Sequence, residues 1–86
     1  MKLSKKILDL VHDIQDLVMQ LKDFHFYYQQ NVQVFQVYRI EDNKHTFKES
    51  VYLDDETASY KLENIKMNLE LILKNESLEG VKYEIL

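Results

Sequence analysis

The strongest constraint on the fold is a regular spacing of apolar residues in the N-terminal third of the chain. These residues recur at alternating intervals of four and three positions, which aligns them along one side of an α-helix. Ser4 is a suitable N-terminal cap, and Asn31 is a suitable end because asparagine tolerates the left-handed backbone conformation. The pattern predicts a helix over residues 4–29. Its apolar line comprises Leu3, Ile7, Leu10, Ile14, Leu17, Leu21, Phe24 and Tyr28.

The middle of the chain is typical of a β-hairpin. Residues 31–40 and 46–53 are rich in β-branched and aromatic side chains, and the polar segment between them contains Asp42 and Asn43, which suit a tight turn. The first of these strands is the more apolar and is expected at the centre of a sheet. Its side facing the helices is predicted to carry Val32, Val34, Tyr38 and Ile40.

A second helix and a final strand are expected after the hairpin. The acidic residues at positions 54–56 suit the first turn of a helix. The four-and-three spacing then returns from Ala58 to Ile72, and the helix is expected to end between Asn75 and Gly80. Residues 81–86 alternate between apolar and polar and predict a C-terminal strand.

These elements define the expected fold class. Their order, α-β-β-α-β, predicts an α+β fold in which two helices pack on one face of a three-stranded antiparallel sheet. A right-handed crossover would bring residues 81–86 beside the central strand. With 86 residues, we expect a single small domain over residues 1–86, since two domains would each be too small to support a core.

A run of aromatic residues, Phe-His-Phe-Tyr-Tyr at positions 24–28, provides the first hypothesis about function. On a helix, Phe26 and Tyr27 cannot point to the same core as the main apolar line. On the predicted central strand, some apolar residues must face outward as well. Grouped exposed aromatics tend to mark interfaces. The predicted aromatic interface comprises Phe26, Tyr27, Phe35, Val37 and Tyr52. The alternatives are that the helix ends early and Phe26 returns to the core, or that these are ordinary isolated exposed residues.

Aspartates on the first helix form the second candidate surface. Asp9, Asp13, Asp16 and Asp23 share one predicted flank. Such a row of carboxylates attracts a basic surface, including one that normally binds nucleic acid phosphates; the alternative is a solvated helix face. The chain itself has a net charge of −4 and a single arginine. We therefore expect no direct binding to nucleic acid, which depends on lysine and arginine.

Motifs for catalysis are missing from the sequence. It has no cysteine, no glycine-rich phosphate loop and no paired-histidine metal motif. His12, with Asp9 and Asp16 nearby, is interpreted as a surface histidine rather than a metal ligand. We expect a protein that is not an enzyme and that uses no metal, no other cofactor and no small-molecule ligand. Acidic residues interrupt the N-terminal apolar segment, which argues against a signal peptide or a membrane span and favours the cytoplasm.

The leading hypothesis is a non-enzymatic module that binds another protein through its aromatic and acidic surfaces. One specific form is an inhibitor encoded by a phage or another mobile element, of the anti-CRISPR or antirestriction type, that binds a nucleic-acid-handling protein. The alternative is a self-associating, homodimeric structural or accessory protein that uses the outer face of its sheet.

Overall fold

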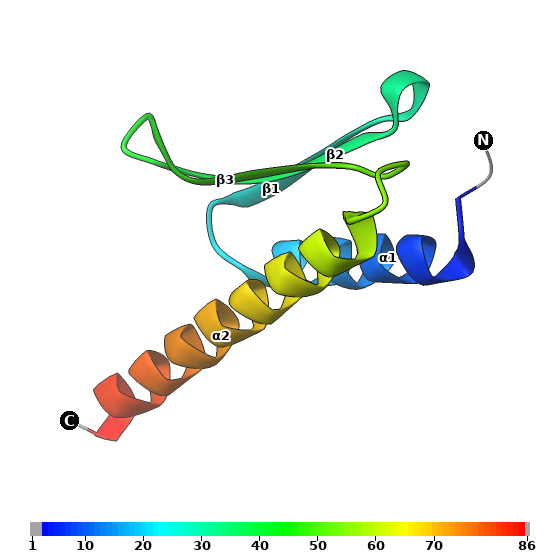
Figure 1. Ribbon diagram of the computed structural model, residues 1–86. Coiled ribbons are helices and arrows are strands. Elements are labelled where there is room, and N and C mark those ends of the chain that lie inside the picture. The colour runs from blue at the N-terminus through cyan, green and yellow to red at the C-terminus, as the bar shows by residue number, and fades with distance from the viewer. Residues whose placement is uncertain (1–2, 86) are drawn as a thin grey trace.

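The computed structural model describes the backbone of residues 3–85 and the side chains of residues 3–76. Both helices lie on one side of a three-stranded antiparallel sheet with the strand order β1-β2-β3 (Figure 1). The predicted α+β class and sheet type are confirmed. The order of elements along the chain is α-β-β-β-α, so the predicted α-β-β-α-β order is wrong. The elements are α1 (Lys5–Gln20), β1 (Phe24–Gln29), the short 3-10 helix η1 (Gln30–Val32), β2 (Val34–Glu41), β3 (Lys44–Tyr52) and α2 (Ala58–Ile85).

The first helix is shorter than predicted, because the aromatic run forms the strand β1. Ser4 caps α1 as expected, its Oγ accepting the backbone N–H of Ile7 at 3.2 Å. The helix ends at Gln20, and Asp23 adopts the left-handed conformation with φ of 66°. Aspartate tolerates this conformation better than most residues. Consecutive aromatic residues favour strands, so residues 24–29 leave the helix and pair with β2.

The hairpin between β2 and β3 has the predicted turn. Asp42 and Asn43 both have positive φ, 51° and 65°, which is the conformation of the type I′ turn that matches the twist of paired strands. The strand pairing shifts register between Arg39 and Ile40, which indicates a β-bulge near the turn. The remaining turn of the sheet, between β1 and β2, has Gln33 at φ of 54°. There the Tyr28 hydroxyl donates a hydrogen bond of 2.9 Å to Gln33 Oε1.

The predicted C-terminal strand is wrong. The helix α2 continues to Ile85, so residues 81–85 are helical, and residue 86 lies outside the described part of the chain. The position beside β2 that this strand was expected to occupy belongs to β1. No crossover is needed among the described residues, since each strand pairs with the next one along the chain.

The face of β2 that points to the helices is also the opposite of the prediction. Phe35 and Val37 are fully buried, whereas Val32 and Ile40 are exposed and Val34 and Tyr38 are half-buried. The cause is the pairing with both neighbours. Phe35 lies opposite Tyr28 of β1 and Val51 of β3, and Val37 lies opposite Phe26. Phe35 thus has apolar or aromatic partners on both neighbouring strands, and Val37 has one on β1, which gives this face the larger apolar area.

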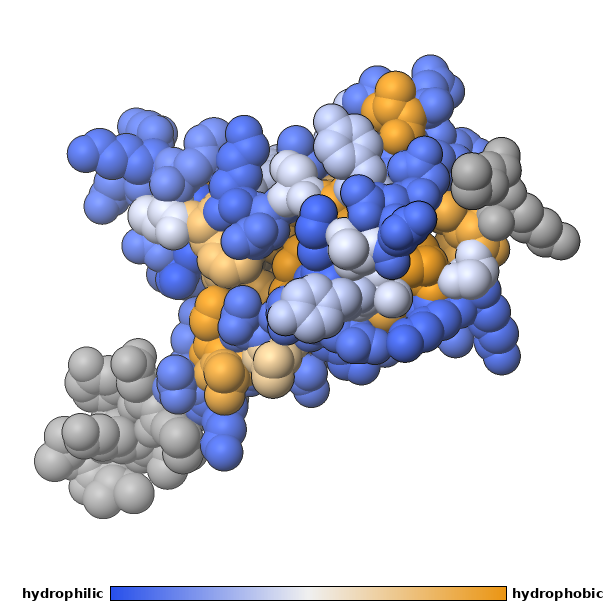
Figure 2. Space-filling model, viewed as in Figure 1, coloured by the Kyte–Doolittle hydropathy of each residue, from blue (hydrophilic) through white to orange (hydrophobic). Residues whose placement is uncertain are grey.

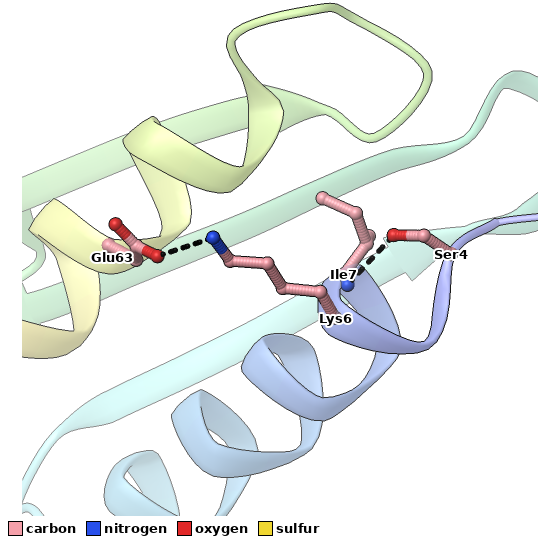
Figure 3. Close-up of polar contacts among 4 residues, drawn as sticks. All are labelled: Ser4, Lys6, Ile7 and Glu63. Carbon is pink, nitrogen blue, oxygen red and sulfur yellow. Dashed lines mark hydrogen bonds and ion pairs between the residues drawn. The ribbon is translucent and has the colours of Figure 1, made fainter.

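The core lies between the sheet and the two helices. Ile14, Leu62 and Leu69 are, with Phe35, Val37 and Val51, the largest fully buried side chains. Two ion pairs tie the helices together at the surface. Lys6 Nζ lies 3.1 Å from Glu63 Oε1 (Figure 3), and Lys66 Nζ donates to Asp13 Oδ2 at 3.0 Å. Exposed pairs of this kind contribute about 0.2–1 kcal/mol each, so packing dominates the stability.

A carboxylate shapes the turn before α2 and leads to a prediction about pH. Asp55 Oδ1 accepts the backbone N–H and the hydroxyl of Thr57, both at 2.8 Å, and these bonds lower the pKa of Asp55 below 3.8. A carboxyl group with a lowered folded-state pKa stabilises the fold at neutral pH and loses this effect as the pH falls through that pKa. We expect Asp55→Ala to lower the thermal midpoint at pH 7, and the difference from wild type to shrink below pH 3.8. Calorimetry at several pH values measures this, and a difference independent of pH would contradict it.

Candidate functional site: the outer sheet face

The face of the sheet turned away from the helices is the candidate site. Neither helix covers it (Figure 1), and a shallow depression of about 400 Å³ lies on it. We call this surface the outer sheet face. The depression is lined by Tyr27, Gln36, Tyr38, Ile40, His45 and Lys48. All three strands contribute to it, because alternate residues of each strand point to the same side.

Three aromatic rings in contact form the centre of this face. The ring of Tyr38 lies between two imidazoles, with its centroid 5.4 Å from that of His25 in a stacked arrangement and 5.7 Å from that of His45 in an edge-on arrangement. Contacts of this kind fix the orientation of the rings. Tyr27 and Tyr52, on the strands at either edge, are 49% and 59% exposed. The outer sheet face therefore presents a group of aromatic side chains to solvent, three of which are in contact.

Charge is distributed unevenly between the two sides of the protein. Although the chain has 15 acidic residues, the strand residues that point outward include no carboxylate. This follows from the register, in which Tyr38 lies opposite both His25 and Lys48, and Gln36 lies opposite Ser50. Glu49 lies opposite the buried Val37 and so belongs to the other side of the sheet. The outer sheet face is free of negative side chains within the strands, although the protein is acidic.

The structure separates the predicted aromatic interface into three groups. Tyr52 lies on the outer sheet face, and so does Tyr27, which was expected to be exposed on the first helix rather than on a strand. The prediction is wrong for Phe35 and Val37, because both are fully buried beneath the helices. Phe26 points to the helix side at the β1 edge, where it is 39% exposed and its ring centroid lies 6.3 Å from that of Phe35. Phe26 is thus partly packed against the core.

Sequence reasoning missed the ring cluster, in which His25, Tyr38 and His45 take part. Residues 24–29 were assigned to a helix, so His25 was not expected on a sheet. The predicted orientation of β2 placed Tyr38 toward the helices. The missed signal was the alternation within the aromatic run itself. On a strand, Phe24, Phe26 and Tyr28 share one side, and the intervening His25 and Tyr27 share the other.

The predicted acidic flank is only partly present. Asp9 and Asp16 are exposed on α1, and among the described side chains neither forms an ion pair. Asp13 pairs with Lys66, and this hydrogen bond raises the pKa of Lys66 above 10.5. Asp23 lies beyond the end of the helix, in the turn before β1. Because α1 and the outer sheet face belong to opposite layers, the acidic and aromatic surfaces do not form one flat interface (Figure 1).

The described part of the chain contains no group of three or more side chains suited to hold a metal ion. Within the same residues, neither helix combines the length and apolarity needed to cross a membrane. The largest concavities open broadly to solvent on the surface.

Comparison with family models, with curated proteins and with solved structures finds no significant match. The class is therefore defined by the fold and the candidate site alone. The chain is a small two-layer α+β protein with an uncovered, aromatic sheet face.

Proposed function

We propose that this protein is a non-enzymatic protein-binding module and that the outer sheet face is its main interface. The observation that supports this most strongly is the grouping of Tyr27, Tyr38 and Tyr52 with Lys48 on a face that carries no strand carboxylate. Tyrosine is common at binding hot spots, because it combines a large contact area with a hydroxyl and loses little conformational entropy on binding.

The properties of this face suggest the kind of partner. The contacts of Tyr38 with two histidines, one stacked and one edge-on, restrict its ring before binding, which would reduce the entropic cost of association. Lys48 would attract an acidic group at the rim of the partner's surface, while Ile40 and Tyr27 contact apolar groups. A protein surface with an apolar centre and at least one carboxylate matches this arrangement.

A specific form of the proposal is an inhibitor, carried by a phage or other mobile element, that acts in the cytoplasm on a nucleic-acid-handling protein. Its support is the small size, the net charge of −4 and the exposed Asp9 and Asp16 on α1. These carboxylates would attract a basic surface by long-range electrostatics. Since they lie on the layer opposite the aromatic face, they would steer the approach or contact a second region of the partner.

Site-specific photocrosslinking tests the proposal. A photoreactive phenylalanine analogue would replace Tyr27 in one variant and Tyr60, exposed on α2, in a control variant. We expect one protein to be crosslinked in bacterial lysate through position 27 and not through position 60. In a binding assay with that protein, Tyr27→Ser combined with Tyr52→Ser should weaken affinity by about a hundredfold, since hot-spot tyrosines contribute 2 kcal/mol or more. Unchanged affinity of the folded double variant would contradict the proposal.

Self-association through the same face is the alternative function, supported by the same exposed Tyr27 and Tyr52. Light scattering over about a hundredfold range of concentration distinguishes the two, because a dimer dissociates by mass action. The proposed function predicts a monomer throughout. A stable dimer that the double tyrosine-to-serine variant converts to monomers would assign the outer sheet face to a second copy of the chain.

A further inference from the structure

The strand β3 has one unpaired edge. In the sheet order β1-β2-β3, β3 pairs only with β2. The strand has nine residues, compared with six in β1. Its pairing with β2 is regular from Arg39↔Phe47 to Val34↔Tyr52. An edge strand of this kind has backbone donors and acceptors available for a further strand.

The direction of these backbone groups follows from one hydrogen bond. Leu53 N–H donates to the carbonyl of Gln33, on the β2 side, at 2.7 Å. Alternate residues of an antiparallel strand direct their N–H and C=O groups to opposite sides. The groups of Val51 therefore point toward β2, and those of Ser50 and Tyr52 point to the free edge.

A groove lies between this edge and α2. It has a volume of about 490 Å³ and is bounded by Glu49, Ser50 and Val51 on β3. The opposite wall comes from α2 and consists of Lys61, Asn64, Ile65 and Asn68. Figure 2 shows apolar residues between the sheet layer and α2, in the view in which α2 crosses in front of α1. Val51 and Ile65 are 1% and 4% exposed and form the apolar floor of the groove.

Two asparagines on α2 face the groove at a spacing of one helical turn. Asn64 is half-buried and Asn68 exposed, and neither amide takes part in a side-chain hydrogen bond among the described residues. A side-chain amide offers both donors and an acceptor. It can therefore bond to the peptide groups of a chain lying in the groove, whatever the sequence of that chain.

We infer that the groove between β3 and α2 binds an extended peptide segment of another protein as a fourth strand of the sheet. The segment would exchange backbone hydrogen bonds with Ser50 and present its own backbone or polar side chains to Asn64 and Asn68. Strand addition of this kind takes its affinity from the main chain and its specificity from alternate side chains. This site lies at the edge of the sheet, next to the outer sheet face, and Lys48 can contribute to both. It does not depend on the function proposed for that face.

The groove also determines which peptide sequence fits. A side chain pointing inward would lie over the floor made by Val51 and Ile65 and should be apolar and small. A side chain pointing outward would lie beside Lys48, where an acidic residue forms a favourable cross-strand pair. The expected segment alternates between apolar and acidic residues.

A second copy of this chain fits the edge less well. Antiparallel pairing of two β3 strands about Ser50 would place Glu49 opposite Val51 of the other copy. It would bury this carboxylate beneath the second copy's helix layer. Such burial is costly even with Lys61 on the groove wall, because the desolvation of a charge can exceed the gain from its partner. A peptide segment brings no helix layer of its own and leaves Glu49 in contact with solvent.

Selection of peptides from a random phage-displayed library on the immobilised protein tests this inference. The best peptide, synthesised with a fluorophore, is the probe for anisotropy titrations. Ser50→Pro removes the outward N–H of the edge without removing any bond to β2, and proline is tolerated at such edge positions. We expect Ser50→Pro to weaken binding by about tenfold or more, through loss of a hydrogen bond and a clash of the ring with the added strand. Ser50→Ala, which retains the N–H, should bind like wild type.

A second measurement does not depend on the folding of any variant. N-methylation of the peptide, one residue at a time, removes single backbone donors from the probe. Strand addition predicts a period of two, in which alternate positions abolish binding and the intervening ones have little effect. Equal effects of N-methylation at all peptide positions would overturn the inference.

The other outcomes are equally informative. Failure to select any binding peptide would overturn the inference, and so would binding that survives Ser50→Pro in a folded variant. If Tyr27→Ser abolishes binding and Ser50→Pro does not, the peptide binds to the outer sheet face. This result would contradict binding in the groove and support the proposed function. Light scattering could instead show a dimer that Ser50→Pro converts to monomers. The edge of β3 would then bind a second copy of the chain, and the peptide hypothesis would be wrong.

Discussion

Replacing Phe35 with alanine is expected to lower the free energy of unfolding by about 3–5 kcal/mol, the usual cost of removing a buried phenylalanine ring. Phe35 is 0% exposed and lies on the central strand between Tyr28 and Val51, so neither helix can move in to fill the cavity without disturbing the sheet. A chain of 86 residues has a total stability of roughly 4–13 kcal/mol. The variant should therefore be largely unfolded or strongly destabilised in urea titrations followed by circular dichroism.

Tyr52→Ala is the matched control for this substitution. Sequence reasoning placed both residues in one outward-facing group, but Tyr52 is 59% exposed. Its replacement should change the free energy of unfolding by no more than about 1 kcal/mol, the range of strand propensities. Equal effects of the two substitutions would show that the face of β2 is assigned incorrectly.

Replacing Leu62 with alanine is the second substitution with a large expected effect, a loss of about 2–5 kcal/mol. Leu62 is 0% exposed and lies on the side of α2 that packs against the sheet and α1. Since alanine has a higher helix propensity than leucine, the loss would report the cavity and not a weaker helix.

The same helix provides a control with the same chemistry. Leu71 is 54% exposed, so Leu71→Ala removes the same atoms from a position that contacts mostly water. We expect a change within about 0.5 kcal/mol, as for other surface substitutions. Thermal and urea unfolding of the two variants, measured together, would separate the buried and exposed sides of α2. A large loss for Leu71→Ala would indicate that this side is covered, for example in an oligomer.

The fold class followed from the sequence because both helices have continuous apolar lines. The boundary of the first helix did not, and the reason lies in Phe24 and Tyr28. Residues four apart share a side in a helix and also in a strand, so the apolar line continued without interruption into β1. In the structure, the left-handed conformation of Asp23 marks the end of the helical region. Aspartate also occurs within helices, so its presence in the sequence did not identify this boundary.

The orientation of β2 could not be decided locally either. Its apolar residues occupy both sides, with Val34 and Tyr38 on one and Phe35 and Val37 on the other. The choice depends on which residues of β1 and β3 pair with them, and this requires the correct strands. For the same reason the candidate site was half predicted. The exposure of Tyr27 and Tyr52 was predicted, although Tyr27 was expected on a helix, while the ring cluster around Tyr38 required knowledge of the sheet.

The turns of the sheet have a consequence for tracing the ancestry of this chain. Both turns contain non-glycine residues with positive φ, namely Gln33, Asp42 and Asn43, and so does the connection between α1 and β1, at Asp23. Each of these positions penalises β-branched and bulky residues and favours glycine, asparagine or aspartate. Core positions can exchange one apolar residue for another until overall similarity is lost. A distant homologue should therefore be recognisable by glycine, asparagine or aspartate at most of these positions, at the same spacing, even where nothing else in its sequence aligns.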